Sequence, residues 1–269
     1  MSDNVTGGAV ASPMRKLSVA ETQVVPLVRL TRVELRKLVD TRAGRWLLIA
    51  IGVITAAVVV IFLFAAPAEE LTYAQFLNAT IIPQAVLLPI LGILTVTSEW
   101  GQRTGLVTFT LEPHRGRIVM AKLLAVLVMG IAVVCVAFVL AAVGNALGAA
   151  LQDGNGSWEF GVSGVIDTFA FQLISVVQGL ALGMLIMNTA GAIVTYFAIP
   201  FAWGFLTATV SWFATIGAWV DLNTTTIPLS THEMTGESWA KLGVSVFIWV
   251  LVPLVLGWMR LLRRELKSA

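Results

Sequence analysis

The sequence predicts an all-α membrane protein with six transmembrane helices, both termini in the cytoplasm, and a basic amphipathic interfacial helix before the first span. Composition is the first reason: 58% of the 269 residues are hydrophobic, 12% are charged, and the mean hydropathy is +0.89. Soluble domains carry about 25% charged residues, so this chain lacks the charge to cover a surface in water. The second reason is the distribution of the charges, which leaves long uncharged stretches. The single cysteine, Cys135, excludes a disulfide scaffold within the chain.

The uncharged stretches define the spans. A helix needs about 20 apolar residues to cross about 30 Å of hydrocarbon. The uncharged stretch 168–220 is too long for one span, and we divide it at 188–191 into two spans joined by a tight connection. The predicted spans are therefore about 46–66, 76–98, 120–148, 167–188, 191–216 and 241–259.

Basic residues predict the orientation. Sixteen of the seventeen Lys and Arg residues lie before the first span, between the second and third, or after the sixth, and the exception is Lys241. Short cytoplasmic loops are rich in Lys and Arg, so these three segments are predicted to be cytoplasmic. Termini on the same side require an even number of spans. We expect a multi-pass protein of the plasma membrane, in a bacterial cell.

The segment before the first span is predicted to hold a mobile tail, 1–23, and an amphipathic elbow helix, 24–45. The tail has no hydrophobic periodicity. In the helix, apolar residues share one face, whereas the basic candidates Arg29, Arg36 and Lys37 lie away from it, and Arg32 adds to the basic set. The apolar residues are Val24, Leu27, Val28, Leu35, Leu38 and Val39. The helix is either a plain membrane anchor or an elbow that also touches a cytoplasmic partner.

The loop 99–119 between the second and third spans mixes apolar residues with charge. An exposed loop does not need residues such as Leu106 and Phe109, so it either folds back on the membrane surface or docks into another protein. Glu99 and Arg103 are four residues apart, a spacing that suits an ion pair on a helix.

Several features of this region occur together. Glu99 ends the second span, a Thr-containing short helix follows, and Lys122 opens the third span after Leu111, Pro113 and Arg115. With the six-span transmembrane domain 46–259, the basic amphipathic helix and the basic tail 260–269, the chain resembles the type-2 ABC transporter (ABC-2) permease family. It departs from the family at Arg103-Thr104-Gly105, where such permeases often place Gly directly before Thr.

The resemblance implies a permease subunit that pairs with a second permease subunit, as a homodimer or heterodimer, and with a cytoplasmic ABC ATPase subunit that holds ATP and Mg. It also implies that the loop couples the two proteins. The expected coupling residues are Glu99, Arg103, Thr104, Leu106, Leu111, Pro113 and Arg115. The permease would form the pathway for efflux of drugs, lipids or other hydrophobic compounds.

The absence of an ATP-binding motif from the sequence agrees with a separate ATPase chain. The sequence has no Gly-x-x-x-x-Gly-Lys-Ser/Thr phosphate loop, so ATP chemistry is expected on another chain. His114 and His232 are predicted on opposite sides of the membrane and cannot share a metal. We therefore expect no enzyme activity, cofactor or metal on this chain, and no nucleic-acid partner. The alternative function is an ATP-independent membrane scaffold or channel.

Polar residues inside the spans are the remaining candidates. Gln84, Asn145, Gln172 and Gln178 are predicted to line the pathway or, more often, to bond neighbouring helices. Gly179 and Gly183 are spaced for close helix contact. Ionisable residues are expected to be absent from the span interiors, which argues against an ion-driven transporter. Ser230 and Glu233 predict a capping box that starts a short external helix.

Overall fold

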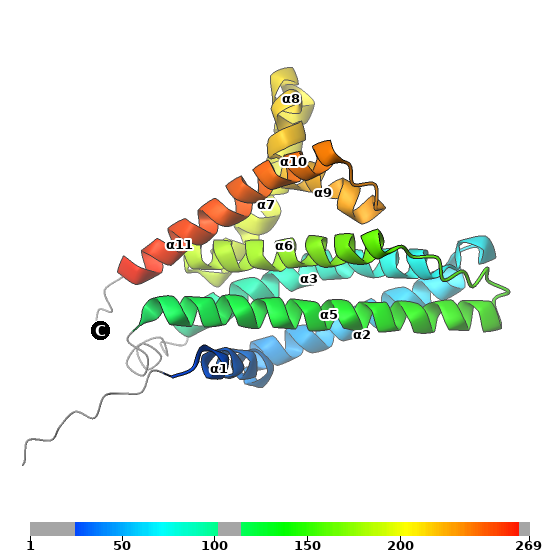
Figure 1. The fold of residues 1–269 in the computed structure, drawn as a ribbon, viewed down its shortest axis with the longest axis horizontal. Coiled ribbons are helices and arrows are strands. Elements are labelled where there is room, and N and C mark those ends of the chain that lie inside the picture. Colours follow the sequence, from blue (N-terminus) through cyan, green and yellow to red (C-terminus); the bar gives the residue numbers. More distant parts are fainter. Residues whose placement is uncertain (1–24, 102–113, 264–269) are drawn as a thin grey trace, which may run out of the picture.

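The computed structural model describes residues 25–101 and 114–263, and every regular element in these ranges is a helix. Figure 1 shows α2, α3, α5 and α6 running along one another as a long bundle, with α1 at one end and α7 to α11 on one side. The all-helical prediction is confirmed. The elements are α1 (Leu27–Asp40), α2 (Arg42–Ala65), the 3-10 turn η1 (Ala68–Glu70), α3 (Tyr73–Gly101), α5 (Arg115–Leu151), α6 (Val162–Ile186), α7 (Thr189–Thr209), α8 (Ser211–Val220), α9 (Leu222–Thr231), α10 (Gly236–Val246), the π-helical turn η2 (Phe247–Leu251) and α11 (Val252–Arg263).

Within the described residues, six helices are long and apolar enough to cross a membrane, which confirms the predicted number of spans. The sixth is continuous through α10, η2 and α11. The third begins at Arg115, before the predicted start. The fifth ends at Thr209 and not at 216, because Val210 adopts an extended backbone (φ −127°, ψ 109°) that stops α7.

The amphipathic segment is a helix, α1, but it ends earlier than predicted. Thr41 has an extended backbone (φ −70°, ψ 144°), and its hydroxyl accepts a hydrogen bond from the Gly44 amide at 3.2 Å, so Thr41 caps the start of α2. A Cβ atom on Gly44 would lie 2.0 Å from the Leu38 carbonyl oxygen. Only glycine therefore allows α2 to approach the end of α1 this closely.

Helices α3 and α6 form the closest pair of long helices. A Cβ on Gly92 would lie 2.2 Å from the Val176 carbonyl oxygen, and a Cβ on Gly179 would lie 2.1 Å from the Pro89 carbonyl oxygen. Gly183 also faces the α3 backbone, at Ile93. The close contact predicted from Gly179 and Gly183 is confirmed, because their missing side chains let the two backbones touch.

The connection between α6 and α7 is as short as predicted. Met187 takes the left-handed conformation (φ 56°) that ends α6. The side chain of Asn188 then accepts a hydrogen bond from the Gly191 amide at 2.8 Å and caps α7. Reversal of the chain thus takes two residues.

After α7 the chain leaves the bundle and returns to it. Figure 1 shows α7 and α8 extending away from the long helices. Helix α8 packs back on α7, since a Cβ on Gly217 would meet Thr207 and Trp203 at 3.0 and 3.1 Å. Asp221 caps α9 by accepting hydrogen bonds from the Asn223 and Thr224 amides at 3.2 and 3.3 Å.

The predicted capping box at Ser230 and Glu233 is wrong. Ser230 lies in the last turn of α9, where its hydroxyl donates to the Ile227 carbonyl at 2.8 Å. The next helix, α10, is capped by Thr235, whose hydroxyl accepts from the Ser238 amide at 3.2 Å. His232 in the left-handed conformation (φ 59°) separates the two helices.

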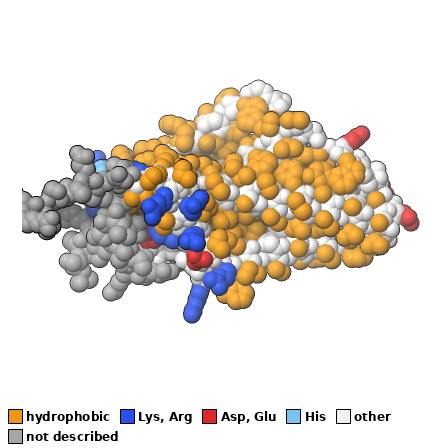
Figure 2. All heavy atoms as spheres, turned by 60° about the horizontal axis from the view of Figure 1, so that its bottom comes forward, with side chains coloured by type: hydrophobic (Ala, Val, Ile, Leu, Met, Phe, Trp, Pro, Cys, Tyr) orange, Lys and Arg blue, Asp and Glu red, His pale blue; other side chains and the backbone are white. Residues whose placement is uncertain are grey.

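Charged residues gather at the two ends of the bundle. Figure 2 shows an apolar surface between a group of basic and acidic side chains at one end and separate acidic side chains at the other. We call the end formed by α1, the start of α5 and the end of α11 the basic end, and the opposite end, with Glu69, Glu70 and Asp153, the acidic end. This separation supports the predicted crossing of a membrane by the bundle, and the placement of the basic end in the cytoplasm stays a prediction.

Candidate functional site

Four charged side chains meet inside the basic end, and we call them the four-charge cluster: Glu34 and Lys37 of α1, Glu99 of α3 and Lys122 of α5. The Lys122 ammonium lies 2.7 Å from Glu34 Oε2 and 2.9 Å from Glu99 Oε1. The Lys37 ammonium lies 2.7 Å from Glu34 Oε1 and 2.6 Å from Glu99 Oε1. Each lysine therefore bridges both carboxylates, and the cluster ties three helices together.

The cluster is buried. Lys122, Glu34 and Glu99 are only 2%, 5% and 7% exposed. Lys122 also donates to the Thr95 carbonyl of α3 at 3.0 Å, so its third proton is not left without an acceptor. Two positive and two negative charges balance, which is the condition under which buried ions are tolerated. Removal of one member would leave a buried charge uncompensated.

Lys37 is the most exposed member of the cluster, and the carboxylates of Glu34 and Glu99 stabilise its protonated form. Burial by itself would lower the pKa of Lys37, but Glu34 and Glu99 together outweigh it, and the pKa is raised above its ordinary value. Lys37 is therefore charged throughout the physiological range. The cluster behaves as a permanent ionic contact under those conditions.

Helical periodicity explains how the cluster forms. On α1, Glu34 and Leu38 are four residues apart and form the buried face. On α5, Lys122 lies on the same buried face as Ile118, Val119 and Ala125. Glu99 lies in the last turn of α3. The apolar neighbours hold the charged groups in register and keep water from most of their surface.

Sequence reasoning missed Glu34, although a signal was present. At 100° per residue Glu34 falls beside Leu27 and Leu38, so it is an acidic residue on the apolar side of a mostly basic helix. Such a position calls for a buried cation, and Lys122 provides it. The predicted apolar face is divided: Leu38 packs inward, whereas Val28 and Val39 are 75% and 47% exposed.

The four predicted elbow residues also differ in exposure. Lys37 joins the cluster, whereas Arg29, Arg32 and Arg36 are exposed. Exposed arginines beside Val28 and Val39 suit the predicted interface between membrane and water. That location stays a prediction.

Of the predicted coupling residues, two are described. Glu99 enters the cluster, and Arg115 donates to the carbonyl oxygens of Leu261 and Leu262 at 3.4 and 3.3 Å. Arg115 thus binds the last turn of α11. The remaining candidates lie outside the described residues, as does the predicted Glu99–Arg103 pair: Arg103, Thr104, Leu106, Leu111 and Pro113.

Two further arginines bind backbone carbonyls at the basic end. Arg117 of α5 donates to the Val25 carbonyl just before α1. Arg260 of α11 donates to the Leu185 carbonyl at the end of α6. Arg260 lies at the carboxyl end of α6, where a cation is favourable because free carbonyls and the helix dipole place negative charge there. With the cluster, these contacts connect α1, α3, α5, α6 and α11 at one level of the bundle.

Three of the predicted polar residues within the spans make structural contacts. Gln172 donates to Gln84 Oε1 at 3.1 Å, which bonds α6 to α3 in the buried core. Asn145 donates to the carbonyls of Gly156 and Ser157 at 3.3 and 3.2 Å and holds the 152–161 loop against α5. These contacts favour a structural role over pathway lining: Gln84 and Gln172 join two helices, and Asn145 holds a loop.

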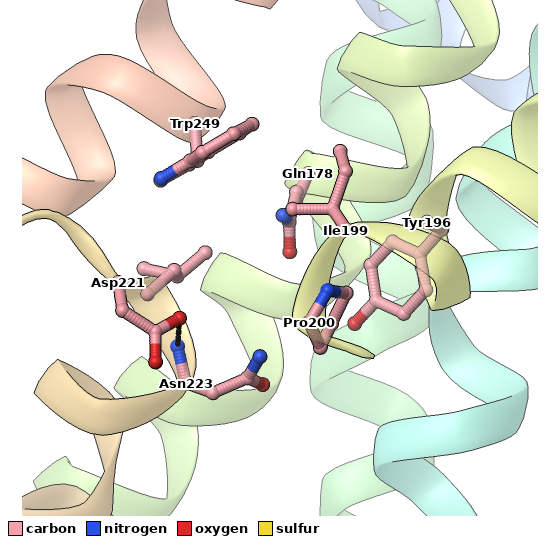
Figure 3. Close-up of a pocket in the computed structure, with 8 residues that line it drawn as sticks. Gln178, Tyr196, Ile199, Pro200, Asp221, Asn223 and Trp249 are labelled. Carbon is pink, nitrogen blue, oxygen red and sulfur yellow. Dashed lines mark hydrogen bonds between the residues drawn. The ribbon is translucent and has the colours of Figure 1, made fainter. Parts of the chain in front are cut away.

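Gln178 lines a pocket instead. Figure 3 shows it with Tyr196 and Pro200 of α7, Asp221 and Asn223 at the α8–α9 junction, and Trp249 of η2. The Trp249 indole donates to the Val220 carbonyl at 2.8 Å and fixes this junction against the sixth span. Asp221 lies between α8 and α9, and α9 packs against α6.

The expectation that span interiors lack ionisable residues fails near their ends. Lys122 lies about 10 Å along α5 from Arg115, and Asp167 lies in the second turn of α6, 3% exposed. Asp167 Oδ2 is 3.7 Å from His232 Nδ1, and the Phe160 ring packs edge-on against the imidazole. The absence of ionisable residues from the spans, which argued against an ion-driven transporter, therefore does not hold for Lys122 and Asp167.

Within the described residues, no three His, Cys, Asp or Glu side chains gather as a metal site would require. Comparison of the chain with protein-family models and with curated proteins found no match. The ABC-2 resemblance therefore stays a prediction, and the case for function depends on the geometry described above.

Proposed function

We propose that the chain is the membrane-spanning permease subunit of an ATP-binding cassette exporter, driven by an ATPase on a separate chain. The observation that carries the proposal is the burial of Glu99 between Lys37 and Lys122, near the end of α3 and just before residues 102–113. In this position a force on the loop is transmitted through charged contacts to α1, α3 and α5 together.

In the proposed mechanism the four-charge cluster is a rigid connection between α1, α3 and α5. The loop binds the ATPase, and closure of the ATPase pulls the loop. Because the cluster connects α3 to α1 and α5, these helices move as a unit, while the pathway opens elsewhere. ATP binding can shift this equilibrium only if the ATPase contacts the loop differently in the two states. The pathway would pair this subunit with a second permease subunit in the plasma membrane.

Two sequence features support the same assignment. The absent phosphate loop means that ATP hydrolysis needs a partner chain. The basic end, which we propose to be cytoplasmic, carries the exposed arginines of α1 on the side where an ATPase would bind. Efflux of a hydrophobic or amphipathic compound fits the six apolar helices.

The proposal is tested with Glu99→Gln, which removes one charge from the cluster at nearly constant volume. The variant and wild type are reconstituted with the co-purified ATPase, and the effect of the permease on ATP hydrolysis is measured. We expect the ATPase to stay bound while its stimulation falls. Glu237→Gln, an exposed carboxylate on α10, is the matched control. Equal stimulation by Glu99→Gln and wild type would remove the coupling role.

A further inference from the structure

We propose that the pocket between α6, α7, the α8–α9 junction and η2 binds an organic cation through its ammonium group, with Asp221 as the counter-charge. The pocket belongs to this chain alone, and the proposal does not depend on an ATPase. Gln178 lies eight residues before the end of α6 at Ile186, about 12 Å from that end and about 24 Å from Val162. The pocket therefore opens within the length of the spans.

Asp221 gives the pocket a negative charge. Its carboxylate accepts hydrogen bonds from the Asn223 amide, the Thr224 amide and the Thr224 hydroxyl, the last at 2.6 Å. Across residues 25–101 and 114–263, no ion pair joins Asp221 to a Lys, Arg or His side chain. Asp221 is half-buried and caps α9, and a cation from outside the chain would neutralise its charge.

Gln178 is a second, independent indication of a ligand. Its side chain is only 9% exposed, and Figure 3 shows its amide directed into the pocket between Trp249 and Pro200. In the described part of the chain the amide forms no hydrogen bond, unlike that of Gln172, which bonds to Gln84. The amide atoms of Gln178 are not among the fully buried polar atoms without a partner, so they are accessible from the pocket. Its oxygen can accept a hydrogen bond from a ligand that carries an N–H or O–H group.

The walls favour an organic cation over a metal ion. Tyr196 and Trp249 present aromatic rings, whose faces attract ammonium groups, and Pro200 adds apolar surface. Hard metal ions instead require several oxygen ligands at short distance. The Asp221 oxygens are already shared with three donors.

The test uses radiolabelled choline and the purified full chain in nanodiscs of phosphatidylethanolamine and phosphatidylglycerol, lipids without a choline head group. We expect saturable binding that Asp221→Asn weakens by at least about tenfold, equivalent to 1.4 kcal/mol. Asparagine still caps a helix, so α9 keeps its start while the charge is lost. Gln178→Leu, which leaves the α9 cap intact, is expected to weaken binding as well.

Two comparisons separate this site from general attraction to a negative protein. Asp153→Asn removes an exposed carboxylate at the acidic end, in a left-handed conformation that asparagine accepts, and should bind choline as the wild type does. The neutral isostere 3,3-dimethylbutan-1-ol should compete poorly. Full binding by Asp221→Asn would overturn the proposal, as would equal competition by the neutral isostere, displacement by sodium at equal concentration, or no saturable binding to the wild type.

Discussion

Lys122 Nζ lies 2.7 Å from Glu34 Oε2, and this contact joins α5 to α1 across 88 residues of sequence inside the basic end. Neither residue belongs to an exposed ion pair, since both are at least 95% buried. The pair gives α1 a fixed position on the bundle, which a membrane anchor held only by lipid would not have.

Loss of Lys122 should destabilise the fold. Lys122→Met leaves Glu34 and Glu99 without their shared buried cation, an effect of about 3–5 kcal/mol for buried pairs. We expect a clear fall in the thermal unfolding midpoint in detergent. Lys241→Met is the matched control, because its partner Glu237 is exposed and such a surface pair contributes about 0–1 kcal/mol. Equal midpoints for the two variants would contradict the importance of the cluster.

Glu34 and Lys122 should also be energetically coupled. Glu34→Gln with Lys122→Met removes one charge of each sign, so the double variant should lose less stability than the sum of the single variants. Residues in direct contact typically show coupling of about 0.5–3 kcal/mol. A double-mutant cycle by thermal unfolding measures it. Strict additivity would mean that the 2.7 Å contact contributes nothing.

The contribution of Lys37 to the stability of the fold should persist at neutral pH and disappear only at alkaline pH. Its pKa is raised in the folded protein, so its stabilising effect is complete below the unfolded value of about 10.4 and is lost as pH rises through the folded value. The difference in unfolding midpoint between wild type and Lys37→Met should stay constant from about pH 7 to 9 and shrink above about 10.4. A difference that disappears near neutrality would contradict this assignment.

Gly179 should not tolerate a side chain. In Gly179→Ala the new Cβ would lie 2.1 Å from the Pro89 carbonyl oxygen, so α3 and α6 must separate, at about 1–3 kcal/mol. Gly204→Ala is the control, because nothing lies within 4 Å of its Cβ and alanine favours the helix. We expect opposite signs in thermal unfolding. Equal effects would mean that the close contact of α3 with α6 is absent.

The long helices could be predicted from the sequence because a bilayer imposes length and apolar composition on each segment separately. The same reasoning located the Gly179–Gly183 contact and the tight turn at Asn188. These features depend on residues close together along the chain. No knowledge of the tertiary fold was needed for them.

Features that depend on distant partners could not be predicted in this way. Glu34 became interpretable only beside Lys122, and nothing nearby in sequence shows that α9 returns to α6. The end of α7 at Val210 is also a tertiary effect, since an uncharged sequence on both sides gives no stop signal. The pocket at Gln178 arises from that return.

Dependence on nucleotide tests the account most directly. The chain is purified gently in native lipid, and ATP-binding proteins that accompany it are identified; the complex is then reconstituted, and conformational change at the basic end is followed by a fluorophore on α1 at Arg29, an exposed position. The account predicts that an ATPase co-purifies and that ATP with Mg changes the signal. A chain that purifies alone, shows no response to ATP, and conducts ions or moves solute without nucleotide would contradict it.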